Sequence, residues 1–409
     1  MKRLIGYMAA LCLLALMVGC GGITSTGTLA YISNSSGTGF TVFNVNTDAT
    51  LTKSSISPQN TPAKPKVLEF SANGKWAYFL DAAGVNLYGY LRAGNGTLTT
   101  QIGVFPLSSA ASAMVISPNS TFIYVALPGF ERLAIYAIDG GTGNLTQQGS
   151  SLQTSFAITQ LIMAPGGGVL YGLSPSQGQV LSYTLNSSSG FATQVANQPA
   201  GTSPTYMVLS ANGAYMYVLS LDTTGFAIPA PVGGAPAPPS CGKTLPTILQ
   251  TPNIYGFNLS SSGAFTAMQT PFNENQDPVT GCFPAAPIAG ATSNDTRFLF
   301  VANRETHNIS SFKISSSTGE LNEVLNSSTT VNGVTVTTGS PFDCGSGCTT
   351  PAFLAVPKAN NGLYLLDPGT QGQPGKIFQF KINQNNGTLR AQNPASVPAE
   401  GNPTWITIR

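Results

Sequence analysis

Charged residues are scarce in this chain. Asp, Glu, Lys and Arg make up 8% of 409 residues, against roughly a quarter in an ordinary soluble domain. The 17 basic and 15 acidic side chains nearly cancel, so we expect no nucleic-acid partner. The single histidine, His307, excludes a histidine-rich metal site and disfavours a histidine-based triad. We therefore expect no metal and no cofactor.

Long hydrophobic runs are also missing, except at the N-terminus. There, about fifteen apolar residues (4–18) follow Lys2 and Arg3, which is typical of a signal peptide and short for a membrane span. No other stretch reaches 18 consecutive apolar residues. We therefore expect the remainder of the chain to be soluble.

The apolar run ends at Gly19-Cys20 and resembles the bacterial lipobox. The resemblance implies removal of residues 1–19, a lipid on Cys20 and a flexible tether over residues 20–27. The alternative is ordinary secretory cleavage with Cys20 as a bystander. Under the lipoprotein interpretation Gly21, in place of aspartate, favours outer-membrane sorting. The expected location is the bacterial cell envelope, in the outer membrane and periplasm or at the cell surface.

The rest of the chain is an internal repeat of short strands. An aromatic residue marks the second strand of each copy, and the first four intervals between these residues are 47, 46, 47 and 46 residues; the positions are Tyr31, Tyr78, Tyr124, Tyr171, Tyr217, Phe300 and Tyr364. A period near 46 with four strands per unit is typical of a β-propeller blade. We therefore predict an all-β fold over residues 28–409, with inserts at about 225–252, 270–287 and 326–350.

The two ends of the repeat region complement each other. The chain enters the repeat at a second strand, Leu29 to Ser33, and leaves it just after an inner-strand pattern, Pro403 to Ile408. The C-terminal strand can therefore supply the missing inner strand of the first blade, which hides the sheet edges. Counting this composite blade predicts a single seven-bladed propeller, and we expect a monomer.

These features resemble a known group of proteins. Strands of the Tyr-Val-Ala-Asn kind, Gly-x-Leu-Thr turns such as 143–146, and Ser340-Pro341-Phe342 before the next blade are similar to the lactonase-like seven-bladed propellers. That group includes 6-phosphogluconolactonases, muconate lactonizing propellers and YVTN-repeat surface proteins. The resemblance implies the fold for nearly the whole mature chain and leaves the chemistry open.

Four cysteines remain after the expected cleavage: Cys241, Cys282, Cys344 and Cys348. Loops of the kinds that carry Cys241 and Cys282 emerge on the same face of a propeller, so a bridge between them is geometrically reasonable. Cys344–Cys348 would close a short loop on that face. Export supports disulfides, and the alternative, a metal site, has cysteine spacing unlike that of zinc ribbons.

One segment resembles an enzymatic motif of the family, and it contains the candidate catalytic residues Arg304 and His307. Arg304 stands at the family spacing from Phe312, whereas His307 is displaced by one position. The resemblance implies that Arg304 orients an anionic lactone and that His307 or a nearby acid handles the proton. The alternatives are a solvated loop arginine paired with Glu305 or Asp343, and a surface histidine.

The same place in the other blades carries no basic residue: it holds Ser35, Ala82, Pro128, Pro175, Leu221 and Pro368. An anionic substrate normally needs several convergent cations. Lys64, Lys66 and Lys243 could reach this face from other loops. We therefore favour a lipid-anchored binding or scaffold module whose partner is an envelope protein, a glycan or a small molecule. The alternative is a lactonase that hydrolyses a sugar lactone.

Overall fold

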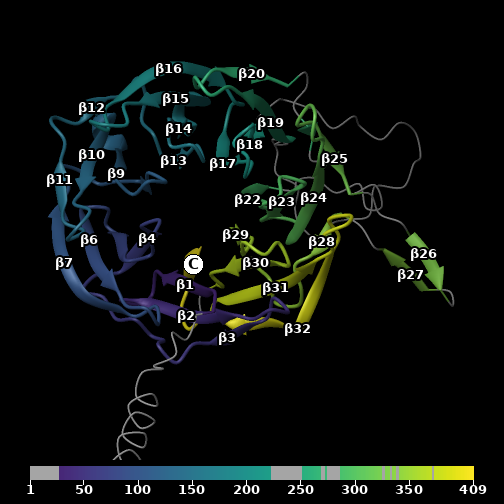
Figure 1. Ribbon diagram of the computed structural model, residues 1–409. Helices are drawn as coiled ribbons and strands as arrows, with labels where there is room; N and C mark the ends of the chain where they lie inside the picture. Colours follow the sequence, from purple (N-terminus) through teal and green to yellow (C-terminus); the bar gives the residue numbers. More distant parts are fainter. Residues whose placement is uncertain are drawn as a thin grey trace, which may run out of the picture.

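The computed structural model describes residues 27–222, 251–268, 272–273, 286–324, 328–331, 334–337, 340–370 and 373–409. These residues form an almost entirely β structure in which seven sheets surround a central axis (Figure 1). The prediction of a seven-bladed propeller is confirmed. Residues 1–26, including Cys20, lie outside the described residues, as do Cys241, Lys243, Cys282 and most of the predicted inserts.

Each blade is a four-stranded antiparallel meander. From inner to outer strand, the first four blades are β33 (Pro403–Ile408), β1 (Leu29–Asn34), β2 (Phe40–Val45), β3 (Leu51–Lys53); β4 (Pro65–Phe70), β5 (Trp76–Asp81), β6 (Asn86–Arg92), β7 (Leu98–Pro106); β8 (Ala113–Ile116), β9 (Phe122–Leu127), β10 (Arg132–Ile138), β11 (Leu145–Gln147); and β13 (Gln160–Met163), β14 (Val169–Ser174), β15 (Gln179–Leu185), β16 (Ala192–Pro199). Short 3-10 turns, η1 (Pro128–Phe130) and η2 (Pro175–Gln177), follow β9 and β14.

The remaining three blades repeat this order. They are β17 (Pro204–Leu209), β18 (Tyr215–Asp222), β19 (Thr251–Leu259), β20 (Phe265–Ala267); β22 (Pro287–Thr292), β23 (Phe298–Asn303), β24 (Asn308–Ile314), β25 (Leu321–Glu323); and β29 (Phe353–Ala355), β30 (Gly362–Asp367), β31 (Lys376–Ile382), β32 (Leu389–Pro398). In blades 3, 5 and 6 a second short strand also pairs with the third strand: β12 (Leu152–Gln153), β21 (Phe272–Asn273) and β28 (Phe342–Asp343). A separate hairpin comprises β26 (Ser328–Val331) and β27 (Val334–Thr337).

The ring closes through the C-terminal strand. β33 pairs antiparallel with β1, with Tyr31 opposite Thr407, and inner strands of successive blades contact one another around the whole circle. The prediction that the last strand completes the first blade is therefore confirmed. The inner strands lie toward the middle of Figure 1, so residues on them are the nearest to the central axis of the ring; the end of this axis beside the loops that follow the second strands is called the channel mouth below.

The repeating aromatic residues lock each blade to the next. Five of the seven tyrosine or phenylalanine positions carry a buried hydroxyl that donates to a backbone carbonyl in the following blade: Tyr31 to Gly96, Tyr78 to Gly143, Tyr124 to Gly190, Tyr217 to Gly319 and Tyr364 to Ala49. In the other two blades a third-strand serine makes the bond instead, Ser182 to Gly263 and Ser311 to Gly387. Every blade boundary thus has the same buried hydrogen bond, worth about 1 kcal/mol each.

The residue that accepts this bond always has a positive φ. Six of the seven are glycines, and the exception is Ala49, with φ of 69°. At blades 2, 3, 5 and 6 the first residue of the second strand is a large aromatic that packs directly against the glycine. At the last boundary that position is Gly362, and the Ala49 methyl occupies the space. The two exceptions to the repeat therefore compensate each other.

Candidate functional site: one mouth of the central channel

The candidate catalytic segment lies at one rim of the channel. Turn 304–307 joins β23 to β24, and the Arg304 N–H donates to the Ala286 carbonyl just before the inner strand β22, at 2.9 Å. The same bond recurs in other blades, from Ser35 to Asn402, from Ala82 to Lys64 and from Leu221 to Ser203. Arg304 therefore begins its loop beside the channel mouth, at the ring position expected from the repeat.

A disulfide loop is attached to this turn. Cys344 and Cys348 form the predicted disulfide, and the Cys344 N–H donates to the His307 carbonyl at 3.1 Å. His307 is half-buried and has a φ of 53°, so the turn is held in a left-handed conformation that few side chains adopt freely. β28 pairs with the start of β24, with Asp343 opposite Asn308. The turn and the disulfide loop form one packed unit.

Four basic side chains are found around the mouth, of which Arg304 and Lys376 belong to or contact this unit. Arg304 is exposed, and the Lys376 ammonium lies against the disulfide loop, 2.8 Å from where a Cβ on Gly347 would stand. On the other side of the mouth, Lys64 is exposed, and the Lys66 Nζ lies 3.4 Å from the Ala111 carbonyl of the next blade. Burial lowers the pKa of Lys66. The sequence identified Arg304, His307, Lys64 and Lys66 but not Lys376.

Three buried aspartates near this mouth hold loops in place. Asp81 and Asp367 end the second strands of their blades and accept backbone N–H groups of the following loop, Val85 at 2.8 Å and Gly369 at 2.7 Å respectively. Asp222 accepts from the Tyr255 hydroxyl at 2.5 Å and from the Thr202 N–H at 2.7 Å. Burial opposes ionisation of Asp222, but its hydrogen bonds hold its pKa below the usual range.

Our reading of the sequence missed this set. For Asp81 and Asp367 the signal is the polar residue that ends the second-strand pattern in most blades, whereas Asp222 lies two residues beyond it; the positions are Asn34, Asp81, Ser174, Ser220, Asn303 and Asp367. These side chains are all buried. The carboxylates of Asp81 and Asp367 satisfy loop backbone, whereas the amides of Asn34 and Asn303 donate to neighbouring side chains. The acids therefore preorganise the mouth, whereas its exposed charges include the cations Arg304 and Lys64.

The inner strands carry a second group that sequence reasoning did not identify. Glu69, on the inner strand β4, is half-buried, and burial raises the pKa of its carboxyl to about 7. Aromatic residues on other inner strands adjoin one another: the Tyr206 and Phe353 ring centres are 6.1 Å apart, and those of Phe353 and Trp405 are 4.4 Å apart. These residues are far apart in the sequence, so the sequence alone did not show that their rings are in contact.

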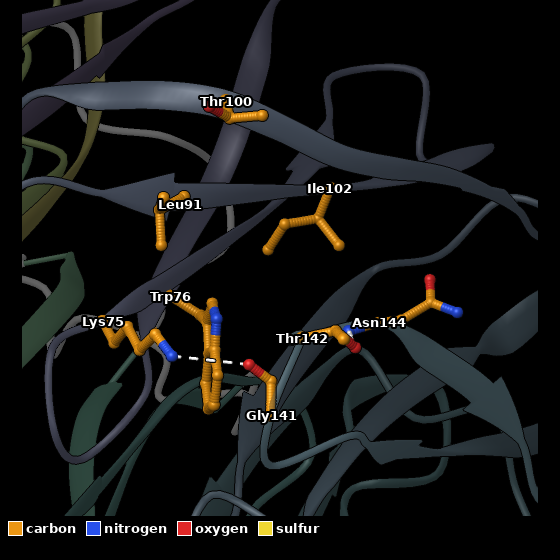
Figure 2. A pocket seen from close by; sticks show the side chains of 8 residues that line it. All are labelled: Lys75, Trp76, Leu91, Thr100, Ile102, Gly141, Thr142 and Asn144. Carbon is orange, nitrogen blue, oxygen red and sulfur yellow. Dashed lines mark hydrogen bonds between the residues drawn. The ribbon is translucent and has the colours of Figure 1, made fainter.

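A cavity of about 710 Å³ lies elsewhere, between blades 2 and 3 (Figure 2). Its lining includes Lys75 and Trp76 from one blade and Gly141 from the next. The Lys75 Nζ sits 4.9 Å from the Trp76 ring centre and 3.4 Å from the Gly141 carbonyl. Trp76 itself is only 3% exposed. The Lys75 ammonium is thus engaged in holding two turns together.

No group of three metal-ligating side chains occurs within the described part of the chain. In the same residues, no helix has the length and apolar character needed to span a membrane.

A closed ring of seven four-stranded blades is a β-propeller. Comparison with solved structures shows which propellers this fold resembles. It is similar to a protein from Lactobacillus plantarum (14% identity, 94% of this chain and 99% of the other, TM-score 0.67) and to a candidate 6-phosphogluconolactonase from Bacteroides uniformis (15%, 94% and 100%, 0.66). The periplasmic gluconolactonase of Pseudomonas aeruginosa is similar to the same degree (16%, 93% and 98%, 0.66). No family model and no curated protein matches the sequence. The chain has the lactonase-like seven-bladed propeller fold.

Proposed function

We propose that this protein is a ligand-binding propeller tethered to the bacterial cell envelope by a lipid on Cys20. The channel mouth that carries Arg304 is the binding surface. The observation that supports this proposal is the exposure of Arg304 and Lys64 at the mouth, where the exposed carboxyls of Glu305 and Asp343 also lie. The buried aspartates there are engaged with loop N–H groups.

This arrangement suits a small organic anion such as a sugar acid. Guanidinium and ammonium groups bind carboxylates through charge-assisted hydrogen bonds, and a rigid loop keeps the ordering cost of binding low. Calorimetric titration with gluconate tests the proposal. We expect saturable binding that Arg304→Ala weakens at least about tenfold, whereas Arg390→Ala, an exposed arginine on the outer strand β32, binds like wild type. Equal affinity in the wild type and Arg304→Ala would contradict the assignment of the mouth.

The anchor needs its own test. Metabolic labelling with a fatty-acid analogue should mark the wild-type protein and not Cys20→Ser, and the variant should leave the membrane fraction. Labelling that persists in Cys20→Ser would exclude the anchor without touching the binding proposal.

Lactone hydrolysis is the second candidate. It is favoured by the fold shared with the periplasmic gluconolactonase and by the position of Arg304 beside the channel. In this function Arg304 orients the lactone, and His307 handles the proton. A rate assay on gluconolactone separates the candidates. Wild-type turnover that falls in both Arg304→Ala and His307→Ala supports hydrolysis, and equal rates near the uncatalysed level reject it.

A further inference from the structure

The channel contains an aromatic arc built from three inner strands. Tyr206, Phe353 and Trp405 occupy the same position of β17, β29 and β33, and their rings contact in series. Tyr206 reaches Phe353 because the strand between them, β22, carries only small residues from 289 to 291 at its centre. The equivalent residues of blades 2, 3 and 4 are Val67, Ala113 and Gln160. Aromatic rings therefore adjoin one another on one side of the ring of inner strands, where they pack against core residues.

The end of the arc lies against β4. The indole N–H of Trp405 donates to the Thr407 hydroxyl at 3.0 Å, and that hydroxyl donates to the Leu68 carbonyl at 2.7 Å. Trp405 also packs against the core cluster that contains Val67. Val67 and Glu69 share one face of β4, because strand side chains alternate. The chain of contacts thus brings the indole to the part of β4 that carries Glu69.

The Glu69 carboxyl has no counter-charge there. Among the residues that the structure describes, none donates a hydrogen bond to it or pairs with it, and burial is what shifts its pKa. The nearest cation on the strand, Lys66, directs its Nζ to Ala111 instead. The equivalent positions in the other blades are apolar or hydroxyl-bearing: Val115, Ile162, Val208, Ala291, Ala355 and Thr407. Glu69 is half-buried, so its carboxyl loses part of its hydration and gains no protein partner in exchange.

We propose that the inner strands hold a binding site for a small organic ammonium ion, with the cation between the Glu69 carboxylate and the indole face of Trp405. Aromatic faces attract organic cations, tryptophan most strongly, and one carboxylate neutralises the single charge. A divalent metal prefers six or more oxygen ligands, and the described residues contain no group of metal-ligating side chains here. This site goes beyond the proposed anion-binding mouth and does not depend on it.

Tryptophan fluorescence gives a direct test, because the chain has two tryptophans. Trp76→Phe leaves Trp405 as the sole reporter, and phenylalanine already fills the equivalent position as Phe122 and Phe298. This background variant is titrated with tetramethylammonium chloride at pH 8, with sodium chloride at matched ionic strength as the reference. We expect a saturable change in Trp405 emission with tetramethylammonium alone.

Adding Glu69→Gln should weaken the binding at least about tenfold, whereas Glu320→Gln, an exposed carboxyl on an outer turn, should leave it unchanged. Circular dichroism establishes that each variant is folded, and a rise in melting temperature with the cation is a second readout. Absence of any emission change and of any melting shift overturns the proposal, as does equal binding by Glu69→Gln. Arg304→Ala should retain cation binding, so failure here is distinguishable from failure of the anion site.

Discussion

The boundary between blades 7 and 1 is packed differently from the others, and this difference can be tested by mutation. At the other boundaries a bulky residue such as Phe122 or Phe298 packs against a glycine, whereas here Gly362 faces Ala49. A Cβ added to Gly362 would lie 2.7 Å from the Ala49 Cβ, which real atoms do not tolerate. Gly362→Phe should therefore lower the free energy of unfolding by about 1–3 kcal/mol, the usual cost of overpacking.

Ala49→Gly should reverse this loss. It removes the clashing methyl and recreates the aromatic-on-glycine packing of blades 3 and 6. It also relieves a left-handed alanine, with φ of 69°, a conformation that costs about 1–2 kcal/mol. Glycine also has a larger conformational entropy in the unfolded state, which reduces this stabilisation by about 0.5–1 kcal/mol. Ala49→Gly alone should therefore stay within about 1 kcal/mol of wild type.

Urea unfolding of the four proteins in this double-mutant cycle gives the coupling energy. We expect the pair Gly362→Phe and Ala49→Gly to be at least about 1 kcal/mol more stable than the sum of the single effects, as contacting residues usually show. Additive effects would mean that the Ala49 methyl does not restrict position 362. The compensation inferred from the structure would then be wrong.

Other groups give shorter tests. Tyr217→Phe leaves the Gly319 carbonyl without its buried donor and should destabilise the protein by about 1–3 kcal/mol in urea unfolding. Tyr90→Phe is the control: the Tyr90 hydroxyl bonds a side chain at a partly buried site, so its loss should destabilise the protein less. Burial raises the pKa of Tyr124 to about 12. The buried neutral phenol therefore contributes its full stabilisation below pH 10 and loses it as the pH rises through 12, so tyrosinate absorbance should appear together with unfolding. Asp222→Asn should lose about 1.5–3 kcal/mol at pH 7, and the difference should shrink in melts at acid pH, because a depressed pKa stabilises only above the unfolded value. The pH dependence caused by Glu69 has the opposite sign. Because burial raises its pKa to about 7, the stability of the protein falls as the pH rises from 4.5 through 7. Glu69→Gln should therefore have a higher melting temperature than wild type at pH 8 and the same melting temperature at pH 4.

The sequence predicts this fold well because its markers are the residues that hold the ring together. The tyrosines spaced 46 or 47 residues apart are buried to 1% exposure or less, and most donate a bond across a blade boundary. Spacing reveals that they repeat, but not what their hydroxyls bind. The acceptor of Tyr78 lies 65 residues away in another blade. The same limit hid the aspartates, whose partners are backbone groups of loops.

The candidate site is harder to predict because it lies where the blades differ. Arg304 could be found, since it stands alone among seven equivalent positions. Lys376 could not, because only the folded disulfide loop brings it near.

Departures from the repeat are of two physical kinds, and the distinction separates structure from function. Ala49 breaks the glycine pattern, but Gly362 compensates for it across the boundary, so packing alone accounts for both residues. Glu69 is the one carboxyl among seven equivalent positions that are otherwise apolar or hydroxyl-bearing, and none of the described residues supplies the charge or hydrogen bond that would offset its partial burial. In a fold built from equivalent blades, a departure without such a compensating residue points to a partner that binds there. The Glu69 region of the inner strands, rather than the hollow between blades 2 and 3 where Lys75 already contacts Trp76 and Gly141, is therefore the place to look for a ligand.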